Sequence, residues 1–151
     1  DPRDLHSFPT RRSSDLKELV RDGILRSYIL SSYSARKLNM ETTGNAGGVR
    51  NLTIDSGELD LAGLLRQMGT GLLVSELMGS GLNMVTGDYS RGAAGFWVEN
   101  GEIQFPVEEI TIAGNMLQMF AGLQAVATDV ERRGSIRTGS WLLEPMTIAG
   151  S

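Results

Sequence analysis

Apolar and aromatic residues occur in short runs along this chain, and turn residues separate the runs. The clearest case is Phe96-Trp97-Val98 followed by Ile103-Gln104-Phe105, with Asn100-Gly101 between them. Asn-Gly readily takes positive φ at both central turn positions, so the pattern predicts a β-hairpin. Pro106 cannot donate a hydrogen bond to a strand ladder and is expected at an edge, a bulge or a strand end.

The same reasoning predicts further strands. A hairpin is expected over 17–30 around Asp22-Gly23, with Tyr28-Ile29-Leu30 extending its second strand. Other short runs predict strands at 51–54, 72–74, 110–112, 135–137, 141–143 and 146–148. Thr147-Ile148-Ala149-Gly150 repeats Thr111-Ile112-Ala113-Gly114. This repeat is typical of two similar strand ends in one sheet and is too short to prove a duplication.

Three stretches have helical patterns. Ser32 is expected to cap a short helix over 33–38, and Asp60 a helix over 61–68 that ends at Gly69. Apolar residues at helical spacing from Met116 to Val130 predict a long helix capped by Asn115. Gly122 inside it indicates close contact with a neighbouring strand. Together the elements predict an α+β fold with a mostly antiparallel sheet and two or three packed helices.

The first sixteen residues, Asp1 to Leu16, do not fit this picture. They lack a start methionine and apolar periodicity, and residues 6–16 read as the translation of a common sequencing adaptor. We expect residues 1–16 to be a non-native, disordered segment, with a natural polar linker as the alternative. On this interpretation residues 17–151 are one domain, truncated on its N-terminal side.

Composition restricts the chemistry that the chain can perform. The sequence has no cysteine and one histidine, His6, which lies in the adaptor-like segment. From Lys17 onward a Ser-His-Asp triad, a Cys-His pair and a zinc site with nitrogen or sulfur ligands are therefore excluded within this piece. A net charge of -4 without a basic cluster makes nucleic acid a poor partner, and no apolar run is long enough to span a membrane.

Several long segments resemble a known family. Residues 87–101 (GDYSRGAAGFWVENG) and 106–115 (PVEEITIAGN) are the most distinctive, and residues 33–38, 43–48 and 68–79 add to them in the same order. The chain from Lys17 onward resembles the C-terminal part of PmbA, also called TldE, in the TldD/PmbA metalloprotease family, whose old label is modulator of DNA gyrase. The resemblance implies the C-terminal-domain fold of that family.

The resemblance also implies a function. TldD and TldE form a cytoplasmic, zinc-dependent peptidase complex that processes or degrades peptides and unfolded proteins. Zinc is expected in the TldD-like partner, and this piece is expected to hold no metal and no catalytic residue. At or near the place where TldD-type chains supply a cysteine ligand, this chain has Thr138, a very poor zinc ligand. The expected partners are a TldD-like subunit and a peptide or unfolded substrate.

The residues expected to face the partner or the peptide are Asp88, Tyr89, Ser90, Arg91 and Gly92, with Gly44 and Asn45 in a glycine-rich loop. Arg91 can pair with a carboxylate, although Asp88 and Arg91 could also pair with each other or cap local turns. The glycine-rich loop lacks the features of a nucleotide-binding loop. Exposed strand edges could also take an extended peptide.

Two alternatives to the non-catalytic subunit stay open. The chain could be the catalytic subunit, with its metal ligands upstream of Lys17, or a peptide-binding or regulatory module without any proteolytic role. Glu108 with Glu109, or Glu99 with Glu102, could in principle act as acid and base. Consecutive strand residues point to opposite faces, so Glu108 and Glu109 are not expected to converge. Whether the chain is an enzyme is therefore left undecided by its sequence.

Overall fold

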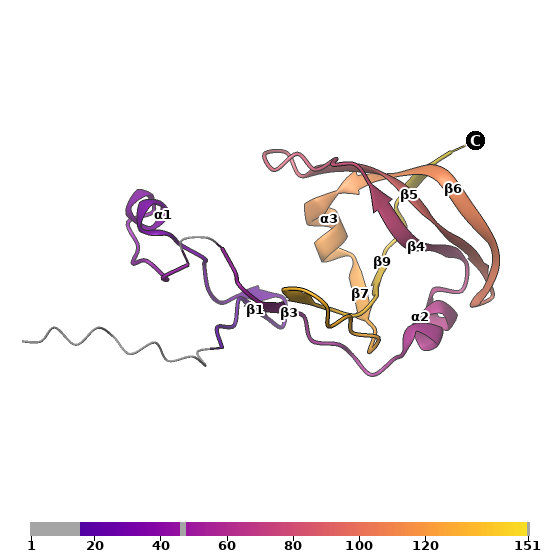
Figure 1. Ribbon diagram of the computed structural model, residues 1–151, viewed down its shortest axis with the longest axis horizontal. Coiled ribbons are helices and arrows are strands. Elements are labelled where there is room, and N and C mark those ends of the chain that lie inside the picture. The colour runs from indigo at the N-terminus through magenta and orange to yellow at the C-terminus, as the bar shows by residue number, and fades with distance from the viewer. Residues whose placement is uncertain (1–15, 46–47, 151) are drawn as a thin grey trace, which may run out of the picture. The chain divides into compact units, whose positions relative to one another are not determined.

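A computed structural model describes residues 16–45 and 48–150. The contacts divide the chain into two compact units, residues 1–50 and residues 51–151. Each unit is described by itself, and Figure 1 shows the elements of both. The adaptor-like residues 1–15 lie outside the described residues.

The first unit contains a small hairpin and one short helix. Strands β1 (Val20–Arg21) and β2 (Ile24–Leu25) pair antiparallel. The turn between them has φ of 53° at Asp22 and 72° at Gly23, as the Asp-Gly dipeptide predicts. Helix α1 (Ser32–Lys37) begins at Ser31, whose side chain accepts from the Ser34 amide. The predicted cap was one residue later, and the predicted extension of β2 over 28–30 is wrong, because the chain leaves the hairpin after Leu25.

The second unit is built on an antiparallel sheet of four strands in the order β10-β6-β5-β4. Its members are β4 (Gly71–Met78), β5 (Asp88–Glu99), β6 (Glu102–Asn115) and β10 (Thr147–Ala149). Figure 1 shows β5 and β6 as a long, curved pair, with α3 (Met116–Ala121) and the pair β7 (Leu123–Val126) and β9 (Trp141–Leu143) on its concave side. The predicted α+β class with a mostly antiparallel sheet is confirmed.

The hairpin between β5 and β6 is confirmed, but the third strand predicted after Pro106 is not separate. Strand β6 continues through Pro106, which lies opposite Phe96. Two β-bulges, each with one extra residue on β6, bend the strand, and at one of them Glu109 takes a φ of 54°. Proline is tolerated because β10 reaches only Thr111–Ala113, so within the described residues the other side of β6 has no neighbour at Pro106.

The long helix predicted from Asn115 is wrong beyond its first turns. Asn115 does cap the helix, but α3 ends at Ala121, and residues 123–126 form strand β7. β7 pairs with β9, and the Glu144 amide donates to the Gly122 carbonyl at 2.9 Å. A Cβ on Gly122 would lie 3.0 Å from the Cβ of Glu144, so the predicted close contact is present. Pairing with a strand distant in sequence overrides the helical spacing.

The remaining elements of the second unit are helix α2 (Leu61–Met68) and the short strand pair β3 (Leu52–Thr53) and β8 (Ile136–Arg137). Helix α2 has the predicted cap, since Asp60 accepts from the Gly63 amide at 2.7 Å. Its C-cap Gly69 accepts from the Gly101 amide at 2.8 Å, which joins α2 to the β5–β6 turn. Strands β3 and β8 pair in parallel. The repeated tetrapeptides are paired strand ends, with Ile148 opposite Ile112.

Two apolar clusters form the core of the second unit. One lies on the sheet and contains Tyr89, Ala93, Ile110 and Ile112, with Met116, Met119 and Met146 packed against it. The other joins α2 to β9 through Leu64, Ala127 and Leu142. The first cluster holds β5 through Tyr89 and Ala93, which fixes the positions of the neighbouring residues predicted to face a partner.

Candidate partner-facing site

The first half of β5 carries the five central residues of the predicted site. Asp88 to Gly92 pair with Asn115 to Thr111 of β6. Strand alternation places Tyr89 and Arg91 on the face of the core cluster, and Asp88, Ser90 and Gly92 on the opposite face. Asp88 and Ser90 are exposed, whereas Tyr89 is buried. The five residues therefore do not form one surface.

Asp88, the first residue of β5, is hydrogen-bonded to the loop that precedes it, residues 83–87. The Asn83 side chain accepts from the amides of Val85 and Thr86, at 2.9 and 3.3 Å. The Thr86 hydroxyl donates to an oxygen of Asp88 at 2.7 Å, and the Asn115 side chain donates to the Thr86 carbonyl at 3.0 Å. The side chains of Asn83 and Thr86 cap the turn, and Asp88 takes part as the acceptor of the Thr86 hydroxyl. Within the described residues Asp88 forms no ion pair with Arg91, in agreement with their opposite faces.

The chain before this loop runs very close to β5. The Ser90 amide donates to the Gly81 carbonyl at 2.7 Å, and a Cβ on Gly81 would lie 1.5 Å from the Ser90 carbonyl oxygen. Only glycine fits there. Between residues 80–83 and 88–90 lies a hollow of about 520 Å³. Asp88 and Ser90 thus line an open depression, and the prediction that this segment faces a partner or a substrate stays a prediction.

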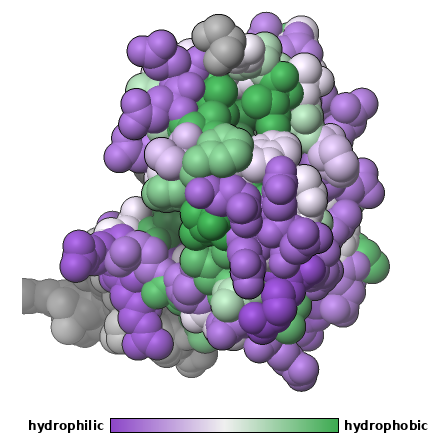
Figure 2. Space-filling view, turned by 90° about the vertical axis from the view of Figure 1, so that its right-hand side faces the viewer, coloured by the Kyte–Doolittle hydropathy of each residue, from purple (hydrophilic) through white to green (hydrophobic). Residues whose placement is uncertain are grey.

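Beyond the depression, the loop tip and the outer strand are exposed. Met84 and Val85 are 84% and 94% exposed, and the second half of β4 is exposed as well. Within the described residues β4 pairs only with β5, so its outer edge is a free strand edge. Figure 2 shows that one face of the molecule has apolar patches, in green, among hydrophilic side chains. The free edge of β4 can accept another polypeptide by strand addition.

Gly44 and Asn45 are not brought to this site by any described contact. Both lie in the first unit, next to residues 46–47, which lie outside the description. The Gly44 amide donates to the Thr42 hydroxyl at 3.2 Å, and Lys17 Nζ donates to the Asn45 side chain at 3.4 Å. These bonds stabilise the loop locally, and the prediction that it faces a partner stays a prediction.

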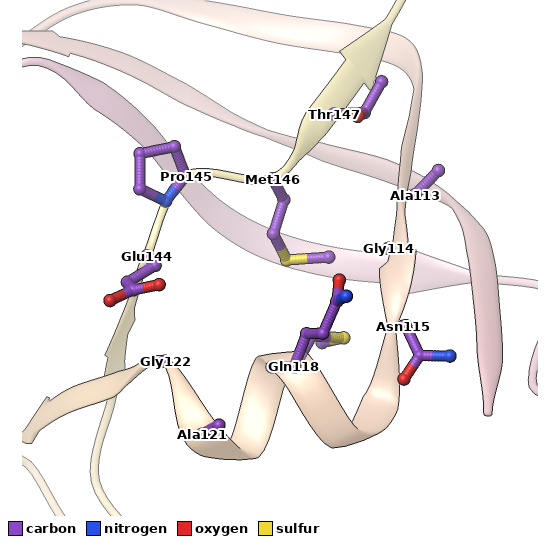
Figure 3. A pocket seen from close by; sticks show the side chains of 11 residues that line it. Ala113, Gly114, Asn115, Gln118, Ala121, Gly122, Glu144, Pro145, Met146 and Thr147 are labelled. Atoms are coloured by element: carbon purple, nitrogen blue, oxygen red, sulfur yellow. The ribbon is translucent and has the colours of Figure 1, made fainter.

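A second cavity of about 520 Å³ was not predicted from the sequence. It lies between α3 and the connection from β9 to β10, and Figure 3 shows the side chains around it. Gln118 and Met146 point toward each other across it, and Glu144 lies at one side. The signal that could have found it is the set of small residues near it, Ala113, Gly114, Ala121 and Gly122. The sequence pattern assigns these residues to a strand and to one long helix, so it does not bring them together around a cavity.

The zinc that the family resemblance implies would need a group of thiolate, imidazole or carboxylate donors. Thr138, at the place expected for a cysteine ligand, accepts from the Trp141 indole nitrogen at 2.7 Å and donates to the Gly139 carbonyl at 3.1 Å. Among residues 16–45 and 48–150 no three His, Cys, Asp or Glu side chains lie together as a metal site would require. The residues that the structure describes therefore do not fit a zinc ion.

One carboxylate near this region has a perturbed pKa. Partial burial raises the pKa of Asp129, but hydrogen bonds from the hydroxyl and the backbone amide of Ser140 outweigh that effect and hold the pKa below its ordinary value. These bonds tie residues 129 and 140 together beside Thr138. The role that follows for Asp129 is structural.

Comparisons with known proteins identify the family of this chain. The family described as "PmbA/TldA metallopeptidase C-terminal domain" matches residues 8–150. The chain is 57% identical over 136 residues to the metalloprotease PmbA homologue of Haemophilus influenzae, covering 89% of this chain and 30% of that protein. It is 54% identical to metalloprotease PmbA of Escherichia coli O157:H7, covering 91% of this chain and 30% of that protein.

A solved structure shares the fold. The crystal structure of a Thermotoga maritima protein labelled a modulator of a DNA gyrase superposes with a TM-score of 0.78 at 36% identity, covering 87% of this chain and 32% of that one. The chain thus spans about 30% of the length of the curated relatives it matches. No helix in the described part of the chain is long and apolar enough to cross a membrane. On this evidence the chain belongs to the PmbA/TldD metallopeptidase family and carries that family's C-terminal domain.

Proposed function

We propose that this chain is part of a PmbA/TldE-like, non-catalytic subunit of a zinc-dependent peptidase complex. Its partner is a TldD-like subunit that holds the zinc, and the complex processes peptides and unfolded proteins in the cytoplasm. The residues from Lys17 onward form the domain that serves subunit assembly and peptide binding, while residues 1–16 have no role in it.

The observation that carries this proposal is the chemistry of the donor set. The chain has no cysteine, its one histidine is His6, and the hydroxyl of Thr138 is already bonded to Trp141. Zinc in proteins is held by thiolates, imidazoles and carboxylates in groups of three or four. A domain without such a group contributes to proteolysis by binding another chain rather than by activating water.

The free edge of β4 supports a peptide-binding role. Its neighbour on one side is β5, and a peptide strand on the other side would gain main-chain hydrogen bonds that depend little on sequence. That suits a complex that takes many unfolded substrates. The exposed loop 83–87 and the depression beside Asp88 and Ser90 are the proposed contacts of this domain with the partner or the substrate.

The proposal is tested by reconstitution. The chain and a TldD-like subunit are mixed, purified together, and incubated with an unfolded casein substrate, with and without zinc. We expect co-purification and zinc-dependent cleavage that is faster with the chain than without it. Cleavage by the TldD-like subunit at the same rate with and without this chain would contradict the proposal.

The alternative is a peptide-binding or regulatory module without any proteolytic role. The same free strand edge favours it, because strand addition needs no catalytic partner. In the reconstitution this alternative predicts peptide binding by the chain alone, no co-purification, and no change in cleavage.

A further inference from the structure

The hairpin turn Asn100-Gly101 carries a chemically reactive sequence. It is the one Asn-Gly pair of the chain, since the other asparagines are followed by methionine, leucine or alanine. The backbone nitrogen that follows an asparagine can attack the side-chain amide, and glycine favours this attack because it has no Cβ to hinder it. Ammonia leaves, and a succinimide ring is formed. Water then opens the ring to aspartate, or to isoaspartate with one extra carbon in the backbone.

The conformation of the folded turn opposes this attack. The φ angle is 53° at Asn100 and 77° at Gly101, as in a type I′ turn. Such a turn holds ψ of its first residue at about +30°, which directs the next backbone nitrogen away from the side chain. Ring closure needs that nitrogen on the side-chain side of the Cα–C bond. Asn100 is exposed, so backbone conformation limits the reaction and access of water does not.

Helix α2 holds the turn in this conformation. The Gly101 amide donates to the carbonyl of Gly69, the C-cap of α2, at 2.8 Å. A Cβ on Gly101 would lie 2.9 Å from Cα of Arg66, so the turn packs directly on the last turn of the helix (Figure 1). The nitrogen that would attack Asn100 is the donor of this hydrogen bond. It becomes free to react only when the helix and the hairpin turn separate.

The Asp22-Gly23 turn of the first unit shows what this contact adds. Its φ angles of 53° and 72° are nearly the same as those of the Asn100-Gly101 turn. Among the described residues, however, nothing lies within 4 Å of a Cβ placed on Gly23. The two turns share a backbone conformation, and of the two it is the Asn-Gly turn that is packed against a helix.

We propose that Asn100 is a deamidation site that the docking of α2 keeps unreactive in the folded chain. When α2 leaves the turn, the Gly101 nitrogen loses its proton and bonds to Cγ of Asn100. The C–N bond of the side-chain amide breaks, its nitrogen takes up a proton, and ammonia leaves. One water molecule then opens the ring, and no oxidant or other reactant is needed. This inference goes beyond the proposed function and does not depend on it.

The isoaspartate product keeps the helix and the turn apart. It lengthens the turn by one backbone carbon, so the Gly101 amide moves away from the Gly69 carbonyl. The new carboxylate also lies next to Glu99 and Glu102, which are paired across the two strands, and like charges opposite each other destabilise a sheet. Because ammonia is lost, the change does not reverse. The contact between α2 and the turn is therefore a one-way conformational switch.

Mass spectrometry measures the reaction directly. The 151-residue chain is kept at mildly alkaline pH in buffer and in concentrated guanidinium chloride, and the tryptic peptide 92–132 is followed for a gain of about one mass unit and for isoaspartate. We expect Asn100 to react at least about tenfold more slowly in the folded chain, because only the open fraction reacts. Equal rates in the two solutions would overturn the inference. Asn100→Gly, which keeps a type I′ turn, should abolish the mass gain, and a gain that persists would also refute the site.

Matched variants test whether α2 controls the rate. Asp60→Ala removes the N-cap of α2 and should accelerate deamidation about fivefold in the folded chain, because α2 then opens more often. Ile112→Val weakens the core cluster on the sheet to a similar extent and should leave the rate unchanged. Equal acceleration in both variants would show that the reaction needs global unfolding. An unchanged rate in Asp60→Ala, with faster amide exchange over residues 61–68, would refute the role of α2 as well.

The aged chain tests the switch itself. After the isoaspartate form is separated, amide exchange of residues 61–68 should be about tenfold faster than in the unmodified chain. Asn100→Asp adds the charge without the extra carbon, and Asp-Gly also suits a type I′ turn, so its exchange should rise less. Unchanged exchange over residues 61–68 in the isoaspartate form would show that the product does not release the helix.

Discussion

The two halves of strand β5 belong to one hydrogen-bonded ladder but differ in how many of their side chains are buried. In the second half, Ala93 and Val98 are fully buried, and Gly95 is pressed against the backbone of β4. In the first half, Asp88 and Ser90 are exposed, and a Cβ on Gly92 would meet Met78 Cβ only at an ordinary 3.5 Å. The two halves are continuous in the sequence GDYSRGAAGFWVE.

The difference shows that one family-typical segment serves two purposes. The second half uses glycine, alanine and valine to bring the strands of the sheet into close contact. The first half places Asp88 and Ser90 beside the segment 80–83 that follows β4, where they line a depression. Substitutions in the second half should therefore change stability, whereas substitutions of Asp88, Ser90 and Gly92 in the first half should change binding with little effect on stability; Tyr89, in the core cluster, belongs with the second half in this respect.

The largest effect is expected for Gly95→Ala. The new Cβ would lie 1.9 Å from the Leu73 carbonyl oxygen, so the β4–β5 ladder must shift. We expect a loss of about 3–5 kcal/mol in the free energy of unfolding, measured by urea titration.

Gly92→Ala is the matched control in the first half of β5. The added methyl group has room, so its free energy of unfolding should change by no more than about 0.5 kcal/mol. Co-purification with a TldD-like subunit should nevertheless weaken. Equal stability losses in the two variants would break the distinction between the halves.

Val98→Ala is expected to cost less than Gly95→Ala. Val98 is 0% exposed, so its truncation removes buried methyl groups and leaves a small cavity. We expect a loss of about 2 kcal/mol in the free energy of unfolding, from the same urea titrations. Val85→Ala, at a side chain that is 94% exposed, should change it by less than about 0.5 kcal/mol. A similar loss in both variants would argue against the core assigned here.

Asp129 gives a pH-dependent reference outside β5. Its folded-state pKa lies below the ordinary value of 3.8, so its contribution to stability is present above about pH 4 and is lost as the pH falls through the folded-state pKa. We expect unfolding titrations between pH 6 and pH 2.5 to show a steeper loss for the natural sequence than for Asp129→Asn. The contribution is at most about 1 kcal/mol, since the carboxylate is largely exposed. Identical pH profiles would contradict the role of the Ser140 bonds.

The smallest effect is expected for Thr86→Val. It removes the hydrogen bond from the Thr86 hydroxyl to Asp88, on an exposed loop at the start of β5. The free energy of unfolding should fall by about 0.5 kcal/mol. Amide hydrogen exchange of residues 83–87 should rise while exchange in the second half of β5 stays unchanged. Faster exchange along the whole strand would show that the two halves are not independent.

Local signals in the sequence predicted the local features correctly. Asn100-Gly101 takes φ of 53° and 77° and forms the predicted hairpin turn. Asp60 and Gly69 bound α2 as predicted, because side-chain caps and glycine stops act over a few residues. In the segment predicted to face a partner, Asp88 and Ser90 are exposed whereas Tyr89 is buried, and its partner-facing role stays a prediction.

Features that depend on distant residues were not predictable in the same way. Residues 123–126 have helical spacing but form β7, because β9 supplies a partner strand at residues 141–143. The cavity beside Glu144 depends on the same distant pairing.

The most direct test of the central proposal is the zinc content and activity of each chain, measured separately and together. Metal analysis after equilibration with one equivalent of zinc should assign the metal to a TldD-like subunit and leave this chain essentially metal-free and inactive alone. The mixture should cleave casein faster than the TldD-like subunit by itself. Tightly held zinc in this chain, or hydrolysis by this chain in isolation, would contradict the account.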